Sequence, residues 1–230
     1  MRVAGFTQPF QVSWLRRDQV KKIGIIGYGA LGRQILGLLF ASGSPDGVAL
    51  FDDALNRQRR ENSFPFDGFL ENCFADYDFY VGLGYQHLPR KAEILRQLLA
   101  AGRSTPSFVH PSCQVHPTCR IGQGCLIYPL CNLGQEVELG HGVLLNNSVV
   151  VSHNSNIGDA AYCSPGVVLS GHVSIGEATF LGSGTVVSNN RRVGARARIG
   201  IGSVVAKDVP DGVSAIGNPL RLLRVSLDLE

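Results

Sequence analysis

Charge of either sign is scarce in this sequence. Its 21 lysines and arginines against 18 aspartates and glutamates leave a formal net charge of +3. That surplus is too small to mark a nucleic-acid-binding surface. Long apolar runs are missing as well: none approaches the roughly 20 residues that cross a bilayer, and the N-terminus lacks the apolar core of a signal peptide. We therefore expect a cytoplasmic protein that binds neither nucleic acid nor membrane.

Cysteine pairs with metal-binding spacing are absent too. No two of the six cysteines stand at the two-to-four-residue spacing that is typical of a zinc site. Cys113, Cys119, Cys125 and Cys131 instead lie six residues apart, and a reducing compartment argues against disulfides. The pattern favours small buried residues of a repeat over ligands or bridges.

That repeat has a period of six residues, and each hexad is numbered here from its aliphatic residue or cysteine. Glycine often stands at the second position, where it suits a chain that turns sharply, and small residues fill the fifth. A period of six fits neither a helix nor an alternating strand, but it fits a short strand followed by a corner, so that the chain coils and the coils stack. The first positions are Val109, Val115, Ile121, Ile127, Leu133, Leu139, Leu145, Val151, Ile157, Cys163, Leu169, Ile175, Leu181, Val187, Val193, Ile199 and Val205.

A glycine-rich pattern precedes the repeat. An apolar strand runs into Gly27-Tyr28-Gly29-Ala30-Leu31-Gly32 and then an amphipathic helix, a spacing at which backbone N–H groups approach a phosphate. Asp52 and Asp53 end the next strand about 20 residues later, where they would meet a ribose hydroxyl. At roughly 80 residues this unit is half of a dinucleotide fold, which favours a nucleotide-sugar over NAD. A ligand-free turn and a solvated strand end are the alternatives.

One side chain in the repeat is not required by packing. His153 occupies the third position of a polar hexad, residues 151–156, near a coil corner. A neutral imidazole can take a proton from an attacking amine or hydroxyl at neutral pH. A structural or binding role is the alternative for His153.

Together these features resemble the hexapeptide-repeat sugar O- and N-acyltransferases, of the sialic acid O-acetyltransferase and nucleotide 4-amino-sugar N-acetyltransferase type. The resemblance covers about residues 21–224, through residues 108–112, the His153 hexad and residues 216–219. It implies an α/β plus all-β fold: an N-terminal extension (1–20), a Rossmann-like βαβ domain that binds a nucleotide-sugar (21–105), and a left-handed parallel β-helix with a C-terminal tail (106–230). A homotrimer, with coenzyme A between neighbouring β-helices, belongs to the same expectation.

The resemblance also implies roles for individual residues. His153 would be the general base, although Asn154 stands where the family usually has an acidic residue that orients the histidine. An amide can hold the ring but brings no negative charge, so either the base is weakened, another acid lies nearby, or the reaction differs. The residues implied to bind acyl-CoA are Tyr162, Gly171, Gly182, Ser183 and Gly217, and the N–H of Gly171 would polarise the thioester carbonyl. The residues implied to bind the nucleotide-sugar are Gly27, Gly29, Gly32, Asp52, Asp53, Gly82 and Arg90.

We therefore predict an acyl-CoA-dependent N-acyltransferase of surface polysaccharide biosynthesis, with acetyl-CoA or another acyl-CoA as its co-substrate. It would act without a metal on the amine of a nucleotide-linked amino-sugar, by direct attack. O-acetylation of a sugar and non-catalytic nucleotide-sugar binding stay open as alternatives. A zinc carbonic anhydrase on the same β-helix would use His141, His153 and His172, but its usual pair of histidines five residues apart is missing. An NAD-dependent oxidoreductase would leave half of the chain unexplained.

Overall fold

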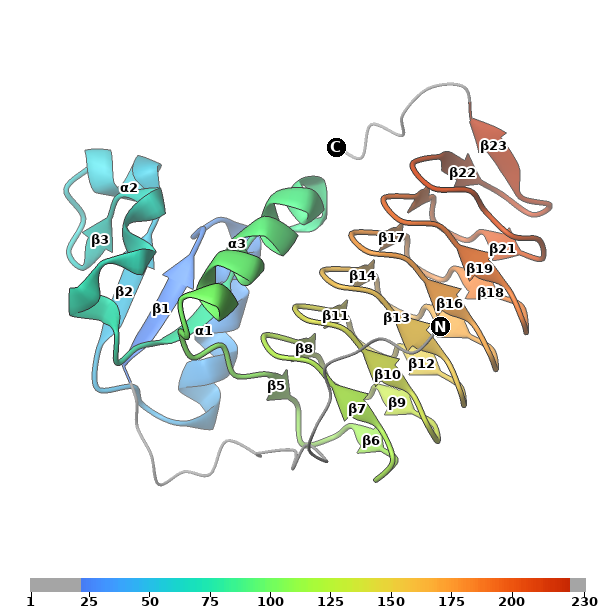
Figure 1. Ribbon diagram of the computed structural model, residues 1–230, viewed down its shortest axis with the longest axis horizontal. Helices are drawn as coiled ribbons and strands as arrows, with labels where there is room; N and C mark the ends of the chain where they lie inside the picture. Colours follow the sequence, from blue (N-terminus) through green and yellow to red (C-terminus); the bar gives the residue numbers. More distant parts are fainter. Residues whose placement is uncertain (1–21, 224–230) are drawn as a thin grey trace.

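The computed structural model describes residues 22–223. The expected N-terminal extension (1–20) and the end of the C-terminal tail, from residue 224, lie outside the described residues. Within the described range an α/β part is followed by a long β-solenoid (Figure 1). No helix between residues 22 and 223 is long and apolar enough to cross a membrane.

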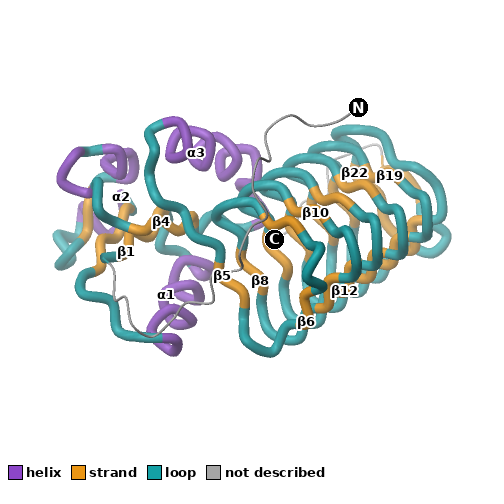
Figure 2. The backbone as a smooth tube through the Cα atoms, turned by 60° about the horizontal axis from the view of Figure 1, so that its bottom comes forward, coloured by secondary structure: helices purple, strands orange, loops and turns teal. Residues whose placement is uncertain are grey.

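The α/β part is built on four parallel strands in the order β3-β2-β1-β4. The apolar strand β1 (Ile23–Ile26) is buried along its whole length, as expected for a parallel sheet covered on both faces. Helices α1 (Ala30–Ser42) and α3 (Leu88–Ala100) lie on opposite sides of this sheet (Figure 2). The other elements are β2 (Val48–Phe51), α2 (Asp53–Arg57), β3 (Ser63–Phe64), η1 (Phe66–Leu70), η2 (Asn72–Phe74), β4 (Asp78–Val81) and η3 (Tyr85–His87).

The hexads fold into stacked coils, as predicted. Strand pairs join residues 18 apart, so that Glu138 pairs with both Arg120 and Asn156. Every first-position residue from Ile121 to Val205 is buried in one continuous core. The eight-stranded sheet consists of β5 (Phe108–Val109), β8 (Leu126–Ile127), β11 (Leu144–Leu145), β14 (Tyr162–Cys163), β17 (Phe180–Leu181), β20 (Arg198–Ile199), β22 (Ser214–Ile216) and β23 (Arg221–Leu223). The six-stranded sheet consists of β6 (Gln114–Val115), β9 (Asn132–Leu133), β12 (Val150–Val151), β15 (Val168–Leu169), β18 (Val186–Val187) and β21 (Val204–Val205). The five-stranded sheet consists of β7 (Arg120–Ile121), β10 (Glu138–Leu139), β13 (Asn156–Ile157), β16 (Ser174–Ile175) and β19 (Arg192–Val193).

The chain turns at the fourth position of the hexad. From Gly124 to Gly202 this residue has φ between +53 and +70°, the left-handed region. The turning role predicted for the second-position glycines was therefore wrong. Those glycines leave room for the next coil, because a Cβ on Gly158 would lie 2.7 Å from the backbone N of Glu177. The fifth position points inward, and its cysteines are free thiols that are buried, except for the partly buried Cys119.

The α/β part docks on the eight-stranded sheet, whose outward side chains from Phe108 to Phe180 are apolar or aromatic. Leu126 and Leu144 join Ile25 of the α/β part in one buried cluster. Farther along the solenoid, the ring of Tyr85 packs on Phe180 with centroids 5.1 Å apart. The α/β part therefore covers one of the three sheets.

Lys91 of α3 is buried against the solenoid beside Gly142. Its Nζ has no hydrogen-bond partner among the described residues, and desolvation lowers the pKa of Lys91 from 10.5 to about 8. Lys91 therefore destabilises the folded state most below about pH 8, because there its amino group is charged in the folded protein as well. The penalty declines as the pH rises towards 10.5, because the unfolded chain binds more protons in that range.

We expect Lys91→Met to be more stable than the parent at pH 7, by up to about 3 kcal/mol. The difference should shrink between pH 8 and 10.5. Denaturant unfolding of both proteins at several pH values measures it. The exposed Lys207→Met is the control and should leave the free energy of unfolding unchanged. A Lys91→Met protein less stable than the parent at pH 7 would contradict this account.

Candidate functional site

His153 lies at the corner between β12 and β13, with its ring exposed. Gly171 occupies the same hexad position one coil later, and the ring covers it: a Cβ on Gly171 would lie 2.7 Å from His153 Nε2. His172 packs edge-on against the ring, with centroids 5.1 Å apart. The structure therefore brings His153 and Gly171 together.

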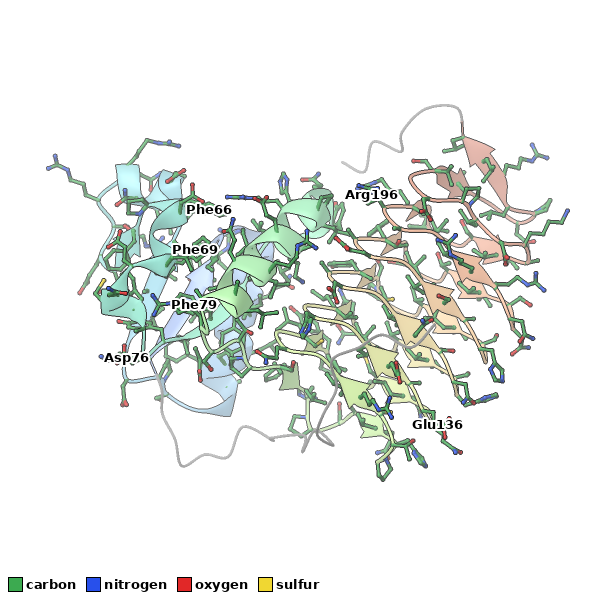
Figure 3. All side chains as sticks on the ribbon, in the orientation of Figure 1. Phe66, Phe69, Asp76, Phe79, Glu136 and Arg196 are labelled. Carbon is green, nitrogen blue, oxygen red and sulfur yellow. The ribbon has the colours of Figure 1, made fainter. Side chains whose placement is uncertain are left out.

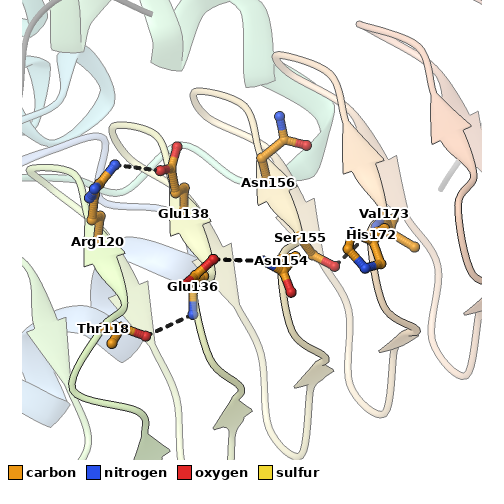
Figure 4. A pocket seen from close by; sticks show the side chains of 9 residues that line it. All are labelled: Thr118, Arg120, Glu136, Glu138, Asn154, Ser155, Asn156, His172 and Val173. Carbon is orange, nitrogen blue, oxygen red and sulfur yellow. Dashed lines mark hydrogen bonds and ion pairs between the residues drawn. The ribbon is translucent and has the colours of Figure 1, made fainter. Parts of the chain in front are cut away.

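The Nδ1 side of the His153 ring faces a polar chain. Asn154 Oδ1 lies 2.9 Å from His153 Nδ1, and Asn154 Nδ2 donates to Glu136 Oε2 at 2.7 Å (Figure 4). Sequence reasoning missed Glu136. Its signal was present, because Glu136 precedes Asn154 by one coil of 18 residues and therefore shares its corner.

The backbone N–H of Gly171 already has an acceptor. It donates to Asn189 Oδ1 at 2.9 Å, from the following coil. A thioester carbonyl could accept from this N–H only if the Asn189 side chain turned away. Asn189 was also missed by sequence reasoning, although it lies 18 residues after Gly171.

Tyr162 lies on a different sheet from His153. It belongs to β14, packs its ring on Tyr85 with centroids 5.9 Å apart, and its hydroxyl accepts from Asn146 Nδ2 at 3.4 Å. Burial is the main cause that raises the pKa of the Tyr162 phenol. Within one chain the structure does not bring Tyr162 to the His153 corner.

The remaining expected acyl-CoA residues lie in later coils. Gly182 packs closely, since a Cβ there would lie 2.7 Å from the backbone N of Ile201, and Ser183 is exposed beside it. Gly217 has a φ of +105° and its N–H donates to Ser203 Oγ at 3.1 Å. Close packing and backbone conformation therefore account for both glycines without a ligand.

Three of the four glycines expected at the nucleotide pack on one another. Cβ atoms on Gly32 and Gly82 would collide with the carbonyl of Gly27, so these residues allow α1 and β4 to meet the loop closely. Gly29 differs, because a Cβ there would meet nothing within 4 Å. It is the N-cap of α1, which has no side-chain cap and no acidic residue in its first turn. Among residues 22–223 no side chain caps this helix N-terminus, so it can receive an anion.

The aspartates and the arginine of the α/β part have partners within the chain. Asp52 caps α2 and its other oxygen accepts from the Tyr28 N–H at 3.0 Å, which fixes the glycine loop. Asp53 accepts from the Phe66 N–H at 2.9 Å. Arg90 pairs with Asp67 and Glu93, and its pKa is raised chiefly by the hydrogen bond to Glu93.

The glycine loop and the His153–Gly171 pair lie on different sides of the solenoid. The α/β part docks on the eight-stranded sheet, whereas His153 lies at the corner between the six-stranded and five-stranded sheets. In a three-sided coil that corner is opposite the docked sheet. Figure 3 shows Glu136, from the same corner, at the edge of the solenoid far from Phe66 and Phe69. One chain therefore does not place its glycine loop beside its own His153.

An open polar groove of about 760 Å³ runs along the five-stranded sheet beside the His153 corner (Figure 4). Among residues 22–223 of one chain, no set of three His, Cys, Asp or Glu side chains is placed to hold a metal ion. The groove is lined by Thr118, Arg120, Glu136, Glu138, Asn154, Ser155, Asn156, His172 and Val173.

The contact between His153 and Gly171 predicts a sensitive position. We expect Gly171→Ala to push the imidazole aside, because its Cβ would lie 2.7 Å from Nε2. A misplacement of about 1 Å can cost about 100-fold in rate. In a His153→Ala background the same change should cost nothing further, since no ring remains to be displaced. Kinetics of the four proteins measure this coupling, and additive losses would contradict it.

Solved structures provide the comparison with known proteins. The acetyltransferase domain of PglB from Neisseria gonorrhoeae superposes with a TM-score of 0.75 at 30% identity, covering 88% of this chain and 100% of that one. GDP-perosamine N-acetyltransferase from Caulobacter crescentus, solved with CoA and GDP-perosamine, gives 0.79 at 27% identity, covering 90% and 99%. Neither a protein-family model nor a curated protein sequence matches the chain.

Coverage of both relatives extends over the α/β part and the solenoid together. The predicted resemblance is thereby confirmed. This chain belongs to the hexapeptide-repeat sugar acetyltransferases.

Proposed function

We propose that this protein transfers an acetyl group from acetyl-CoA to the amine of a nucleotide-linked amino-sugar, with His153 as the general base. The relatives support the substrates: the PglB domain has been solved with acetyl-CoA, and the Caulobacter enzyme with CoA and GDP-perosamine. The observation that carries the proposal is the exposed imidazole of His153, held at Nδ1 and lying over Gly171.

The reaction needs no covalent enzyme intermediate. The amine nitrogen of the sugar attacks the thioester carbonyl carbon, and His153 Nε2 takes a proton from that nitrogen. The Gly171 N–H donates to the carbonyl oxygen as it gains charge, once Asn189 has released it. The C–S bond then breaks, the imidazolium returns its proton to the thiolate of CoA, and the amide product leaves.

The α/β part is proposed as the Rossmann-like nucleotide-sugar domain, residues 21–105, and the solenoid as a left-handed β-helix. The free N-terminus of α1 at Gly29 supports a site for the diphosphate. Asp52 holds the loop that forms this site. Acetyl-CoA and nucleotide-sugars occur together in the cytoplasm, where we place the reaction, as a step towards surface polysaccharide.

We propose a homotrimer in which the glycine loop of one copy faces His153 of a neighbour. The support is that the glycine loop and His153 lie on opposite sides of one solenoid. Coenzyme A would lie between neighbouring solenoids. A stable and active monomer in native mass measurement would refute this arrangement.

The test is release of free thiol from acetyl-CoA in the presence of UDP-, GDP- and dTDP-linked amino-sugars. We expect turnover with at least one amino-sugar and none with its hydroxyl analogue. Turnover only with hydroxyl acceptors would assign O-acetylation instead. Binding of the nucleotide-sugar, without thiol release from any acceptor, would assign a non-catalytic role.

A further inference from the structure

The side chains of Glu136 and Asn154 meet because they occupy the same hexad position in successive coils. Both are at the fourth position, and both have a φ of +55°. The backbone stacks the two corners, with the Asn154 N–H donating to the Gln135 carbonyl at 2.8 Å. The same geometry at both residues sends the side chains outward next to each other, as Figure 4 shows.

The carboxylate of Glu136 fixes the orientation of the Asn154 amide. An ionised carboxylate only accepts hydrogen bonds, so the NH₂ group of Asn154 must face Glu136, at 2.7 Å. The amide oxygen is then directed at His153 Nδ1, at 2.9 Å. Because an amide oxygen also only accepts, Nδ1 must carry the proton, and Nε2 is left as the basic nitrogen.

Three other histidines of the solenoid have the opposite arrangement. Backbone N–H groups donate to Nδ1 of His110, His116 and His141 at 3.2, 3.3 and 3.0 Å. Their neutral rings therefore carry the proton on Nε2, which cannot then act as a base. His153 is held in the other tautomer, and Glu136 is the group that determines it.

We infer that Glu136 is a positioning residue that acts on His153 through Asn154. This inference rests on the proposed function, in which Nε2 is the base. The carboxylate selects the Nδ1–H tautomer in the resting enzyme. When Nε2 takes the proton of the amine, the Nδ1–H of the imidazolium still donates to the side-chain oxygen of Asn154. The NH₂ group of Asn154 remains directed at the negative charge of Glu136. The acid that the family usually has next to the histidine is thus supplied from the preceding coil.

Steady-state kinetics test this role. Glu136→Gln should lower kcat by about 10- to 100-fold, the usual effect of losing a group that orients an imidazole. KM for both substrates should change less than about twofold, since Glu136 reaches them only through Asn154 and His153. The matched control is Glu138→Gln, an exposed acid of the same groove that pairs with Arg120 and should keep the parent's kcat. A parental kcat in Glu136→Gln would overturn the inference.

A rescue variant separates positioning from a merely structural effect. Glu136→Gln combined with Asn154→Asp places a carboxylate directly on Nδ1, and aspartate tolerates the left-handed corner as asparagine does. We expect the double variant to regain at least about tenfold of the lost kcat. If it stays as slow as Glu136→Gln while remaining folded, Glu136 acts in some other way and the inference fails.

A tautomer measurement makes failure of the inference distinguishable from failure of the proposed function. In protein labelled with ¹⁵N-histidine, NMR of the His153 ring should show the proton on Nδ1 in the parent and a shift towards Nε2 in Glu136→Gln. The signals are assigned by their loss in His153→Ala. This result without any acetyl transfer would keep the tautomer control and refute the function. Acetyl transfer by the parent, with the same tautomer of His153 in the parent and in Glu136→Gln, would support the function and refute the inference about Glu136.

Discussion

Replacing His153 by alanine is expected to lower kcat/KM by about 100- to 10,000-fold, the usual contribution of a general base. The loss should appear in kcat, because the imidazole acts on the proton that moves in the transition state rather than on substrate binding. Since the ring is exposed, its removal opens no cavity in the core, and the Tm should stay close to that of the parent.

The matched control is His116→Ala. His116 is an exposed histidine of the same column of corners, two coils before His153, and its Nδ1 accepts from a backbone N–H. We expect its removal to leave turnover unchanged. Equal losses in the two variants would mean that the column needs its histidines for folding, and that His153 has no special chemical role.

Replacing Gly29 by aspartate is expected to have opposite effects on stability and binding. Aspartate is a good N-cap and the space there is open, so α1 gains a cap and the Tm should rise slightly or stay the same. The same carboxylate would face the diphosphate. Repulsion of about 3 kcal/mol raises KM for the nucleotide-sugar about 100-fold.

Gly29→Asn isolates the effect of charge. Asparagine matches aspartate in size and capping, so its KM should rise far less than that of Gly29→Asp. Calorimetric titration with the nucleotide-sugar, alongside thermal unfolding, measures both effects. Equal affinity in the aspartate variant and the parent would show that the nucleotide binds away from the N-terminus of α1.

The solenoid could be predicted from the sequence because its period is a local property repeated many times. Each hexad buries its own first and fifth residues, so the pattern survives without knowledge of distant contacts. The same period implies that residues 18 apart are neighbours, and it places Gly171 beside His153. Applied backwards from Asn154, the same period also indicates Glu136 as an acid near His153.

The position of the α/β part could not be predicted in this way. The repeat specifies inward residues, whereas docking depends on outward ones, such as Leu126 and Leu144 on a single sheet. The position of the left-handed turn within each hexad could not be predicted either. Glycine at the second position is conspicuous in the sequence, but the left-handed fourth position is occupied by residues as different as Glu136, Ala160 and His172.

The most direct test of the account is complementation between two impaired variants, assayed at a nucleotide-sugar concentration far below the raised KM of Gly29→Asp. His153→Ala keeps a functional loop, and Gly29→Asp keeps a functional base. If each site combines the loop of one copy with the histidine of another, mixed trimers purified through two different tags should regain activity at about one in three of their sites. Mixed oligomers as inactive as either parent variant, despite confirmed assembly, would contradict a site formed between copies.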